Sequence, residues 1–305
     1  MKVELARLLT AMVTPMREDG SVDYDAARRL ARILVADGSD GVVVAGTTGE
    51  SPTLGDREKL ELTSCVKEAI GEHLVVTGTG GNDTRHSVEL SKAAAEAGAD
   101  AVLCVVPYYN KPTQEGIYRH FEAIAEAVPV PIIMYNIQGR TGVNMTSETT
   151  LRCARLPRVI GVKEASGNLE QMGFVCAGRP EGFRVWSGDD ALTLPLLAVG
   201  GDGVICVVSH LAGSAMRGMI EAHAAGDNTR ARSIHHGLLP LMTTLMTAAS
   251  NPIPVKAALN ELGFPAGHYR LPLAPMGRPD LERVMAAVAA AGDLVSFPKM
   301  AVHVS

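Results

Sequence analysis

Lys163 is the residue of this chain whose type and position best suit covalent chemistry. It ends a short, apolar, β-branched stretch at 159–163, and a Ser-Gly-Asn turn at 166–168 follows. This pattern is typical of a buried parallel strand that leads into a helix. Burial favours the neutral amine of a lysine, which can attack a ketone and form a Schiff base. The alternative is a strand-end lysine whose ammonium group reaches solvent.

The neighbours of Lys163 along its strand indicate where the side chain has room. Because side chains alternate along a strand, we expect Val159, Gly161 and Lys163 on one face. Ile160 and Val162 then lie on the other face. A glycine beside Lys163 leaves space for its long side chain.

Two other lysines compete for the covalent role. Lys111 lies in a loop before a proline, and Lys256 begins a helix after Pro254. We expect both amines to be more exposed than that of Lys163, which makes Lys163 the preferred nucleophile.

The composition indicates an α/β enzyme that acts on small molecules. Of 305 residues, 47% are hydrophobic and 20% are charged, with 31 glycines and 17 prolines. The formal charge of −5 includes no basic run, so we expect neither nucleic acid nor an anionic membrane as a partner. The five scattered cysteines form no CxxC pair, which indicates reduced core thiols.

The sequence indicates a cytoplasmic protein. Glu4 and Arg7 interrupt the N-terminal stretch in which a signal peptide would have its apolar centre. The longest uncharged run, 237–255, contains three prolines, which favours a buried helix and a loop over a membrane span.

Short apolar runs alternate with amphipathic runs along most of the chain. The apolar runs predict eight strands, at 8–13, 41–46, 74–78, 100–106, 131–135, 158–163, 183–187 and 202–208. The runs between them predict helices such as 24–37, 56–70, 84–97, 115–128 and 192–199. Eight such units predict a (β/α)8 TIM barrel. A doubly wound sheet is the alternative, but its glycine-rich first turn is missing, since 14–16 reads Thr-Pro-Met.

The strand pattern stops after about residue 226, and a helical extension is predicted beyond it. Its helices are expected at 229–249, 254–262 and 279–291, with the prolines of 251–254 separating the first two. We therefore predict a catalytic barrel over 1–226 and a C-terminal helical extension over 227–305. The tail at 296–305 shows no clear period.

Catalytic groups of such a barrel follow the strands at its C-terminal face. Residues 46–51, Gly-Thr-Thr-Gly-Glu-Ser, can turn tightly and present N–H groups to a carboxylate, although a plain capped turn would look similar. Tyr108 and Tyr109 follow the fourth strand, and Tyr135 ends the fifth. Each could be a packing residue, but a phenol beside an amine can shuttle the protons of Schiff-base chemistry.

Charged groups are expected on the same face. Arg140, in a glycine-flanked loop, is either a surface residue or a bidentate partner for a substrate carboxylate. Asp189 and Asp190 follow Gly188 at the end of the seventh strand, and we interpret them first as helix caps and second as substrate contacts. The sequence has no HExxH motif, carboxylate cluster or Ser-His-Asp order, so neither metal nor serine-hydrolase chemistry is predicted.

Taken together, these motifs resemble a known family. The motifs are GTTGES at 46–51, YYNKPTQEG at 108–116, YN and RTG within 135–142, GVKEASGN at 161–168, SGDD at 187–190 and NPIPVK at 251–256. Their order and separation closely resemble the pyruvate-dependent class I aldolases, the family that includes N-acetylneuraminate lyase. The resemblance covers nearly the whole chain. The best match within the family is the branch that joins pyruvate to L-aspartate 4-semialdehyde in lysine biosynthesis.

The resemblance implies a role for each group. Lys163 would form the Schiff base with pyruvate without any cofactor, and Tyr135 would pass protons, with Thr47 and Tyr109 completing the relay. The N–H groups of Thr47 and Thr48 would hold the pyruvate carboxylate. Other expected substrate contacts are the carbonyl of Ile205, Gly188, Asp189, and Arg140 for the carboxylate of L-aspartate 4-semialdehyde.

Two other functions remain open at this stage. One is a sister aldolase that acts on a sugar-derived 2-keto acid with the same lysine and tyrosine. The other is a non-catalytic barrel that only binds pyruvate. The chain also departs from the family before Arg140, where Gln138-Gly139 replaces the usual proline and small residue and gives the loop more freedom.

The resemblance further implies assembly and regulation. We expect a homotetramer, a dimer of dimers, with Tyr108 and Tyr109 at a subunit interface. A possible allosteric site for L-lysine comprises Ser51, Asp56, Lys59, Asn82, His86 and Tyr108. Because the glutamate of lysine-sensitive members is absent there, we expect weak or no feedback by L-lysine.

Overall fold

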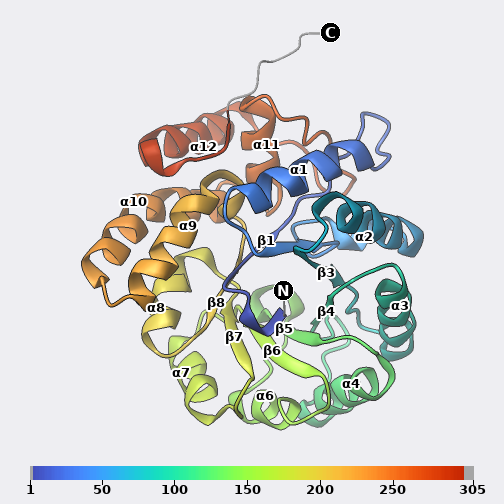
Figure 1. Ribbon diagram of the computed structural model, residues 1–305. Helices are drawn as coiled ribbons and strands as arrows, with labels where there is room; N and C mark the ends of the chain where they lie inside the picture. Colours follow the sequence, from blue (N-terminus) through green and yellow to red (C-terminus); the bar gives the residue numbers. More distant parts are fainter. Residues whose placement is uncertain (1–2, 299–305) are drawn as a thin grey trace.

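The computed structural model describes residues 3–298, and it is a closed barrel of eight parallel strands (Figure 1). Each strand pairs with its neighbours in chain order, and β1 pairs with β8 to close the sheet. The strands are β1 Leu8–Ala11, β2 Gly41–Val44, β3 Leu74–Gly78, β4 Ala101–Val105, β5 Ile132–Asn136, β6 Val159–Glu164, β7 Arg184–Ser187 and β8 Gly203–Cys206. The predicted TIM barrel is confirmed.

Helices surround the barrel and continue beyond it. Those interleaved with the strands are α1 Tyr24–Ala36, α2 Asp56–Ile70, α3 Thr84–Glu96, α4 Gln114–Ala127, α5 Gln138–Thr141, α6 Ser147–Cys153, α7 Leu169–Gly178 and α8 Thr193–Ala198. After β8 come α9 Ser209–Ala224, α10 Asn228–Thr247, α11 Ile253–Glu261 and α12 Arg278–Ala291. Short 3-10 helices are η1 Val3–Leu5, η2 Ser51–Thr53, η3 Asp190–Leu192 and η4 Gly292–Leu294.

Side-chain caps fix where several of these helices begin. The Asp23 carboxylate accepts the N–H of Ala26 at 2.9 Å at the start of α1. Asp83, Thr113, Thr146, Asn168 and Asp227 cap α3, α4, α6, α7 and α10 in the same way. Such residues satisfy N–H groups that a helix cannot pair internally. Local sequence therefore sets the boundaries between the loops and the helices.

The barrel has an inner and an outer apolar layer. The inner layer includes Leu9, Val43, Val76, Ile133 and Trp186 from the strands. Outer layers lie between strands and helices, and nearly every strand position is buried. Strands buried on both faces read as continuous apolar runs, which is why the sequence identifies them.

The amino-terminal segment closes one end of the barrel. Figure 1 shows η1 lying across the middle of the ring of strands. The indole Nε1 of Trp186 donates a hydrogen bond to the carbonyl of Ala6 at 2.8 Å, which ties this segment to the barrel interior. This segment therefore covers one end of the barrel, and we expect the site at the other end, where the strands have their carboxyl ends.

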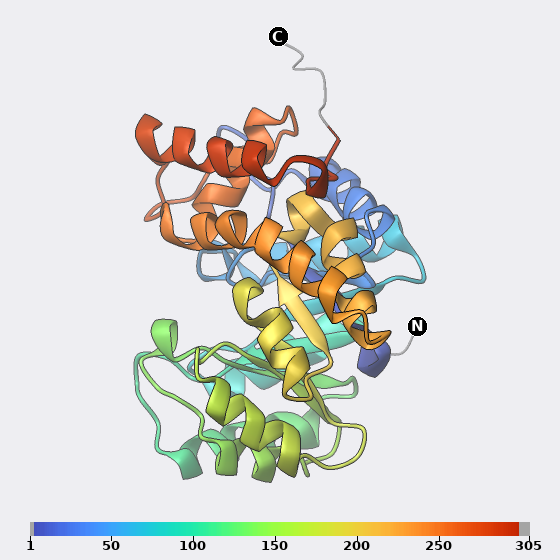
Figure 2. The same cartoon turned by 90° about the vertical axis from the view of Figure 1, so that its left-hand side faces the viewer.

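The C-terminal helices pack on one side of the barrel (Figure 2). Helices α10, α11 and α12 share one apolar cluster with α1 and α9. They lie where the sequence predicts the extension, with Pro240 inside α10. The division into parts at 226/227 stays a prediction, and its outermost residues, 1–2 and 299–305, lie outside the described residues.

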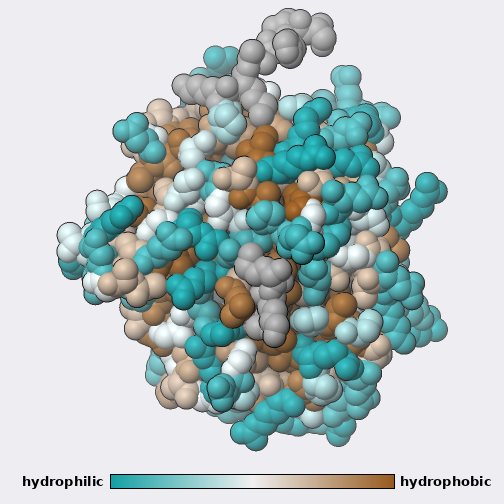
Figure 3. Space-filling view, in the orientation of Figure 1, coloured by the Kyte–Doolittle hydropathy of each residue, from teal (hydrophilic) through white to brown (hydrophobic). Residues whose placement is uncertain are grey.

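The face drawn in Figure 3 mixes hydrophilic and hydrophobic residues. Within residues 3–298, no helix combines the length and the apolar character that crossing a bilayer requires.

One detail of strand β6 differs from the expected alternation. The register of β5 with β6 shifts between Ile132 and Ile133, so that Ile133 pairs with Gly161. Val159 consequently packs in the outer layer with Val162, and Ile160 packs against the inner layer. The expectation that Val159 shares a face with Lys163 was wrong, because a bulge inserts one residue into the alternation.

Closure of the barrel leads to a prediction for Gly203 in β8. A Cβ on Gly203 would lie 2.1 Å from the carbonyl oxygen of Arg7, next to the bond that Val204 N–H donates to the same oxygen. We expect Gly203→Ala to reduce the free energy of unfolding by about 3 kcal/mol, because strand β8 must move away from β1. Thermal unfolding followed by the fluorescence of the single tryptophan measures this.

A matched control is Gly173→Ala in α7, where an added Cβ meets nothing within 4 Å. That change should leave the melting temperature unchanged or raise it, since alanine favours a helix. Equal stability of the two variants would contradict the prediction.

Candidate active site

Lys163 lies inside the barrel beside Tyr135. In the strand register, Lys163 pairs with Tyr135 of β5 on one side and with Trp186 of β7 on the other. Its Nζ lies 4.5 Å from the centre of the Tyr135 ring, and the residue is only 6% exposed. The structure therefore brings these two predicted site residues together.

The space for the Lys163 side chain comes from Gly188 and not from Gly161. A Cβ on Gly161 would lie 2.5 Å from the ring of Trp186, so this glycine makes room for the indole. A Cβ on Gly188 would lie 3.0 Å from Lys163 Cε and 2.7 Å from Ala165 Cβ. The expected room beside Gly161 was wrong, because the strand register places a large residue of β7 there.

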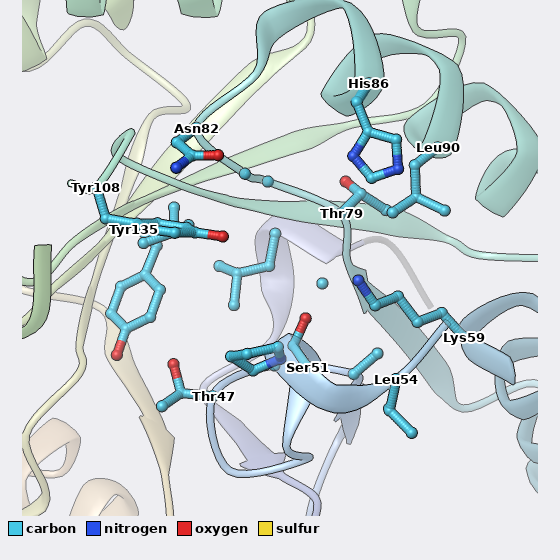
Figure 4. A pocket seen from close by; sticks show the side chains of 18 of the residues that line it. Thr47, Ser51, Leu54, Lys59, Thr79, Asn82, His86, Leu90, Tyr108 and Tyr135 are labelled. Carbon is cyan, nitrogen blue, oxygen red and sulfur yellow. The ribbon is translucent and has the colours of Figure 1, made fainter. Parts of the chain in front are cut away.

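A cavity of about 470 Å³ opens beside Tyr135 at the carboxyl ends of the strands. Figure 4 shows the hydroxyl groups of Tyr135 and Thr47 pointing toward one another at one end of it. Its other lining residues include Gly46, Ser51, Leu54, Lys59, Thr79, Asn82, His86, Leu103, Tyr108 and Arg140. The cavity is large enough for a small organic acid.

The loop 46–51 lines this cavity through Gly46, Thr47 and Ser51, and its first three residues, within the described part of the chain, donate no backbone N–H to a protein acceptor. The N–H groups of Gly49, Glu50 and Ser51 donate to carbonyls within the same loop. Over residues 3–298, the N–H groups of Thr47 and Thr48 have no protein acceptor. Two adjacent N–H groups without acceptors form a binding place for a carboxylate. Thr48 itself is buried, and its Oγ1 accepts a bond from Asn251 Nδ2 at 3.0 Å.

Arg140 lies at the rim between this cavity and a second, more open depression. It belongs to the short helix α5, which ends at Gly142 in the left-handed region, and its side chain is exposed. The second depression is lined by Ala165, Ser166, Asp189 and Asn251 among others. The loop expected around Arg140 is thus a single helical turn, and its guanidinium is free to meet an anion from either side.

The two aspartates after β7 have different tasks. Asp189 caps η3 by accepting the N–H of Ala191 at 3.0 Å, as predicted. Asp190 is buried and instead accepts the N–H groups of Val207 and Val208, at 3.1 and 2.6 Å. The prediction that Asp190 caps the following helix was wrong, because its carboxylate crosses to the loop after β8.

Sequence reasoning missed Glu164, which lies behind the Lys163 strand end. Its carboxylate is fully buried and accepts bonds from Ser166 N–H, Asn136 Nδ2 and Gln171 Nε2. Burial raises the pKa of Glu164. The carboxylate links the ends of β5 and β6, which carry Tyr135 and Lys163. An acidic residue directly after an apolar strand was the available signal.

The tyrosines after β4 and Ile205 are not brought to Lys163. Tyr109 is 87% exposed, has a φ of 74° and lines neither depression. Tyr108 is 38% exposed and lines the cavity wall. Ile205 is completely buried in the inner layer with Tyr135. The predicted roles of Tyr109 and Ile205 therefore stay predictions.

All six residues of the possible allosteric site line the cavity that reaches Tyr135. These residues are Ser51, Asp56, Lys59, Asn82, His86 and Tyr108. Lys59 and His86 project into the end away from Thr47 (Figure 4). His86 Nε2 lies 2.7 Å from a carboxylate oxygen of Asp56, so this wall does carry an acidic group. Burial lowers the pKa of Lys59, although Asp56 opposes the shift.

Comparison with known proteins agrees with this geometry. Residues 4–291 match the model of the dihydrodipicolinate synthetase family. The chain is 53% identical to the 4-hydroxy-tetrahydrodipicolinate synthase of Moorella thermoacetica over 291 residues, which cover 95% of this chain and 99% of the relative. This chain belongs to the dihydrodipicolinate synthetase family.

Solved structures of family members superpose closely. The enzyme from Cyanidioschyzon merolae with lysine bound has a TM-score of 0.93 and 46% identity, covering 95% of this chain and 99% of that one. The enzyme from Acinetobacter baumannii complexed with pyruvate has a TM-score of 0.91 and 38% identity, covering 94% and 99%. The barrel and the C-terminal helices are therefore those of the dihydrodipicolinate synthetase family.

The two competing lysines have different environments in this family member. Lys111 is exposed, as predicted. Lys256 is completely buried, so the expectation of an exposed amine was wrong. Its Nζ lies 2.8 Å from Glu50 Oε1, and burial lowers its pKa while Glu50 opposes the shift. The partner carboxylate, 206 positions earlier in the chain, is the physical reason why this lysine can be buried.

Asp190 provides a pH-dependent prediction. Burial raises its pKa from 3.8 to about 6, although the N–H groups of Val208 and Val207 oppose the shift. Between these values the folded chain keeps a proton that the unfolded chain has lost, so stability falls as the pH rises. We expect the unfolding free energy of the parent minus that of Asp190→Asn to fall by about 2.4 kcal/mol from pH 4 to pH 7. Denaturant unfolding at several pH values measures it.

Glu58 serves as a control of opposite sign. Its hydrogen bond from Arg270 lowers the pKa of Glu58, so its contribution to stability is lost as the pH falls. The unfolding free energy of the parent minus that of Glu58→Gln should therefore rise as the pH rises. A difference for Asp190→Asn that stays constant or rises would contradict the assignment.

Proposed function

We propose that this chain condenses pyruvate with L-aspartate 4-semialdehyde to give 4-hydroxy-tetrahydrodipicolinate, a step of lysine biosynthesis. Its curated relatives, about half of whose residues are identical over nearly the full length, are lyases with this activity. The observation that carries the proposal is the buried Lys163 amine against the ring of Tyr135. Tyr135 lines the same cavity as Thr47, whose N–H has no protein acceptor over residues 3–298.

The pyruvate half-reaction follows from these positions. The N–H groups of Thr47 and Thr48 hold the carboxylate, which directs the ketone carbon to Lys163 Nζ. Attack by the amine gives a carbinolamine, and loss of its oxygen as water gives the Schiff base. Tyr135, with Thr47 beside it, moves the protons of these two steps. Loss of a methyl proton then gives the enamine, with nitrogen as the electron sink.

The second half-reaction requires another anion site. The enamine carbon attacks the aldehyde of the semialdehyde, whose carboxylate binds Arg140 at the rim. The substrate amine then adds to the Schiff-base carbon and displaces Lys163, which closes the ring and frees the enzyme. Gly188 lies beside Lys163, and Asp189 lines the second depression, which Arg140 also lines. Both residues are therefore placed near the second substrate.

The exposure of Tyr109 supports a shared site in an oligomer. A phenol that is 87% exposed on a strained backbone has no task within one subunit. Tyrosines are favoured at protein interfaces, so we propose that Tyr109 enters the site of a neighbouring subunit in a homotetramer. Tyr108 then separates the pyruvate site from the Lys59 and His86 wall, where we propose weak or no binding of L-lysine.

The test of the function is covalent trapping. Pyruvate and borohydride should convert the Schiff base to a stable secondary amine on the peptide that contains Lys163, located by mass spectrometry after digestion. Lys163→Ala should abolish the adduct and lower kcat by about 1000-fold or more, since the nucleophile is lost. Lys111→Ala is the control and should retain both the adduct on the Lys163 peptide and the parent kcat. An adduct on a peptide without Lys163 would refute the assignment.

Arg140 determines the choice of the second substrate. Arg140→Ala should lower kcat/KM for L-aspartate 4-semialdehyde by about 10- to 150-fold, because hydrogen bonds to charged groups contribute about 1.5 to 3 kcal/mol. Arg140→Lys should recover part of the loss, since an ammonium cannot copy the planar fork. The measurement is steady-state kinetics with the semialdehyde varied.

Arg155→Ala changes an exposed arginine away from the cavity and serves as the control. Adduct formation with pyruvate should survive in all three variants. If the parent prefers an uncharged sugar aldehyde, the sister-aldolase function replaces the proposed one.

A further inference from the structure

The buried ion pair between Glu50 and Lys256 has no part in the chemistry described so far. Both residues are at most 1% exposed. Lys256 Nζ lies 2.8 Å from Glu50 Oε1 and also donates to the carbonyl of Thr14 at 3.0 Å and to that of His268. The other carboxylate oxygen of Glu50 accepts the N–H of Arg270 at 3.2 Å. Every polar atom of the pair therefore has a partner.

The pair joins two parts of the molecule that are distant in sequence. Lys256 lies in α11 of the C-terminal extension, whereas Glu50 lies in the loop that follows β2. Asn251, two residues before α11, makes a second connection to the same loop by donating to Thr48 Oγ1 at 3.0 Å. The extension thus contacts the loop 46–51 with two buried polar groups, Asn251 at Thr48 and Lys256 at Glu50.

Glu50 transmits this contact to the free N–H groups. Its φ of 58° places it in the left-handed region, which a residue other than glycine adopts only under constraint. Its N–H donates to the carbonyl of Thr47 at 3.1 Å, and Thr14 Oγ1 donates to the carbonyl of Gly49 at 2.7 Å. The direction of the Thr47 and Thr48 N–H groups depends on this turn.

We propose that Glu50 and Lys256 are positioning residues that hold the Thr47–Thr48 turn in its carboxylate-binding shape. The C-terminal extension thereby sets the affinity for pyruvate without touching it. This inference rests on the proposed function, because it assigns the turn to the pyruvate carboxylate.

Stability alone is a poor explanation for the pair. Removing two charges from water is unfavourable, and well-packed apolar residues often replace a buried ion pair with equal or greater stability. Burial lowers the pKa of Lys256, which reflects this unfavourable desolvation. An apolar pair would make no directional hydrogen bonds. The Glu50 carboxylate, in contrast, accepts hydrogen bonds from Lys256 and from the Arg270 N–H at the same time, which fixes its orientation.

The experiment compares pyruvate affinity with stability in three variants of the full-length chain. Lys256→Met and Glu50→Gln each leave one buried charge unpaired, and the double variant removes both charges. The half-saturating pyruvate concentration is read from borohydride-trapped adduct, and the melting temperature is measured in parallel. The control is Leu259→Ala in the same helix α11, which removes buried apolar contacts and keeps the pair.

We expect each single variant to melt at a lower temperature and to need about 10- to 100-fold more pyruvate, as for a displaced binding group. The double variant should regain most of its melting temperature but keep the raised pyruvate requirement. Leu259→Ala should lose stability at an unchanged pyruvate requirement.

Two results would overturn the inference. One is a double variant that is as stable as the parent and binds pyruvate normally. The other is a Leu259→Ala variant whose pyruvate requirement rises as much as that of Glu50→Gln. If Lys256→Met does not fold, Glu50→Gln alone tests the inference, because it is the milder of the two single changes. A parent chain that forms no adduct at all would instead refute the proposed function.

Discussion

The parallel hydrogen-bond ladder that closes between β1 and β8 is the constraint on which the site depends. Once closed, it directs the carboxyl ends of eight strands toward one opening. The register then decides which side chains meet, and it pairs Lys163 with Tyr135 and with Trp186. A shift of one residue in either strand would turn one of these side chains to the opposite face. The pairing of the backbones therefore determines which positions are neighbours in the site.

A second rule, that buried polar groups must have partners, shapes the surroundings of the site. Glu164 accepts from three donors, Asp190 from two backbone N–H groups, and Lys256 pairs with Glu50. Each of these groups bridges elements that are adjacent in space. The Thr47 and Thr48 N–H groups, which have no protein acceptor over residues 3–298, stand out against this background. This is why we propose them as the binding place of the pyruvate carboxylate.

The parts that the sequence predicts are those with a local signal. Strands buried on both faces are apolar runs, and caps such as Asp23 and Asn168 mark helix starts, so the barrel could be derived. Lys163 and Tyr135 could be placed because strand ends share one face. The bulge at Ile160 could not be predicted from the sequence, because it depends on the pairing of β6 with β5. The burial of Lys256 was missed for a related reason: its counter-charge, Glu50, is far away in sequence.

The contact of Lys256 with Glu50 also has a consequence for the order in which the enzyme is made. Synthesis delivers all eight strands before α11, and domains form from the amino end while the ribosome is still adding residues. A barrel assembled at that moment contains Lys163 and Tyr135 but lacks the amine that holds the Thr47 turn. On the proposed roles of these residues, the nascent chain has the Schiff-base lysine in place before the carboxylate-binding turn is complete. The proposal thus places full capture of pyruvate after translation has passed the last strand and the C-terminal helices have docked.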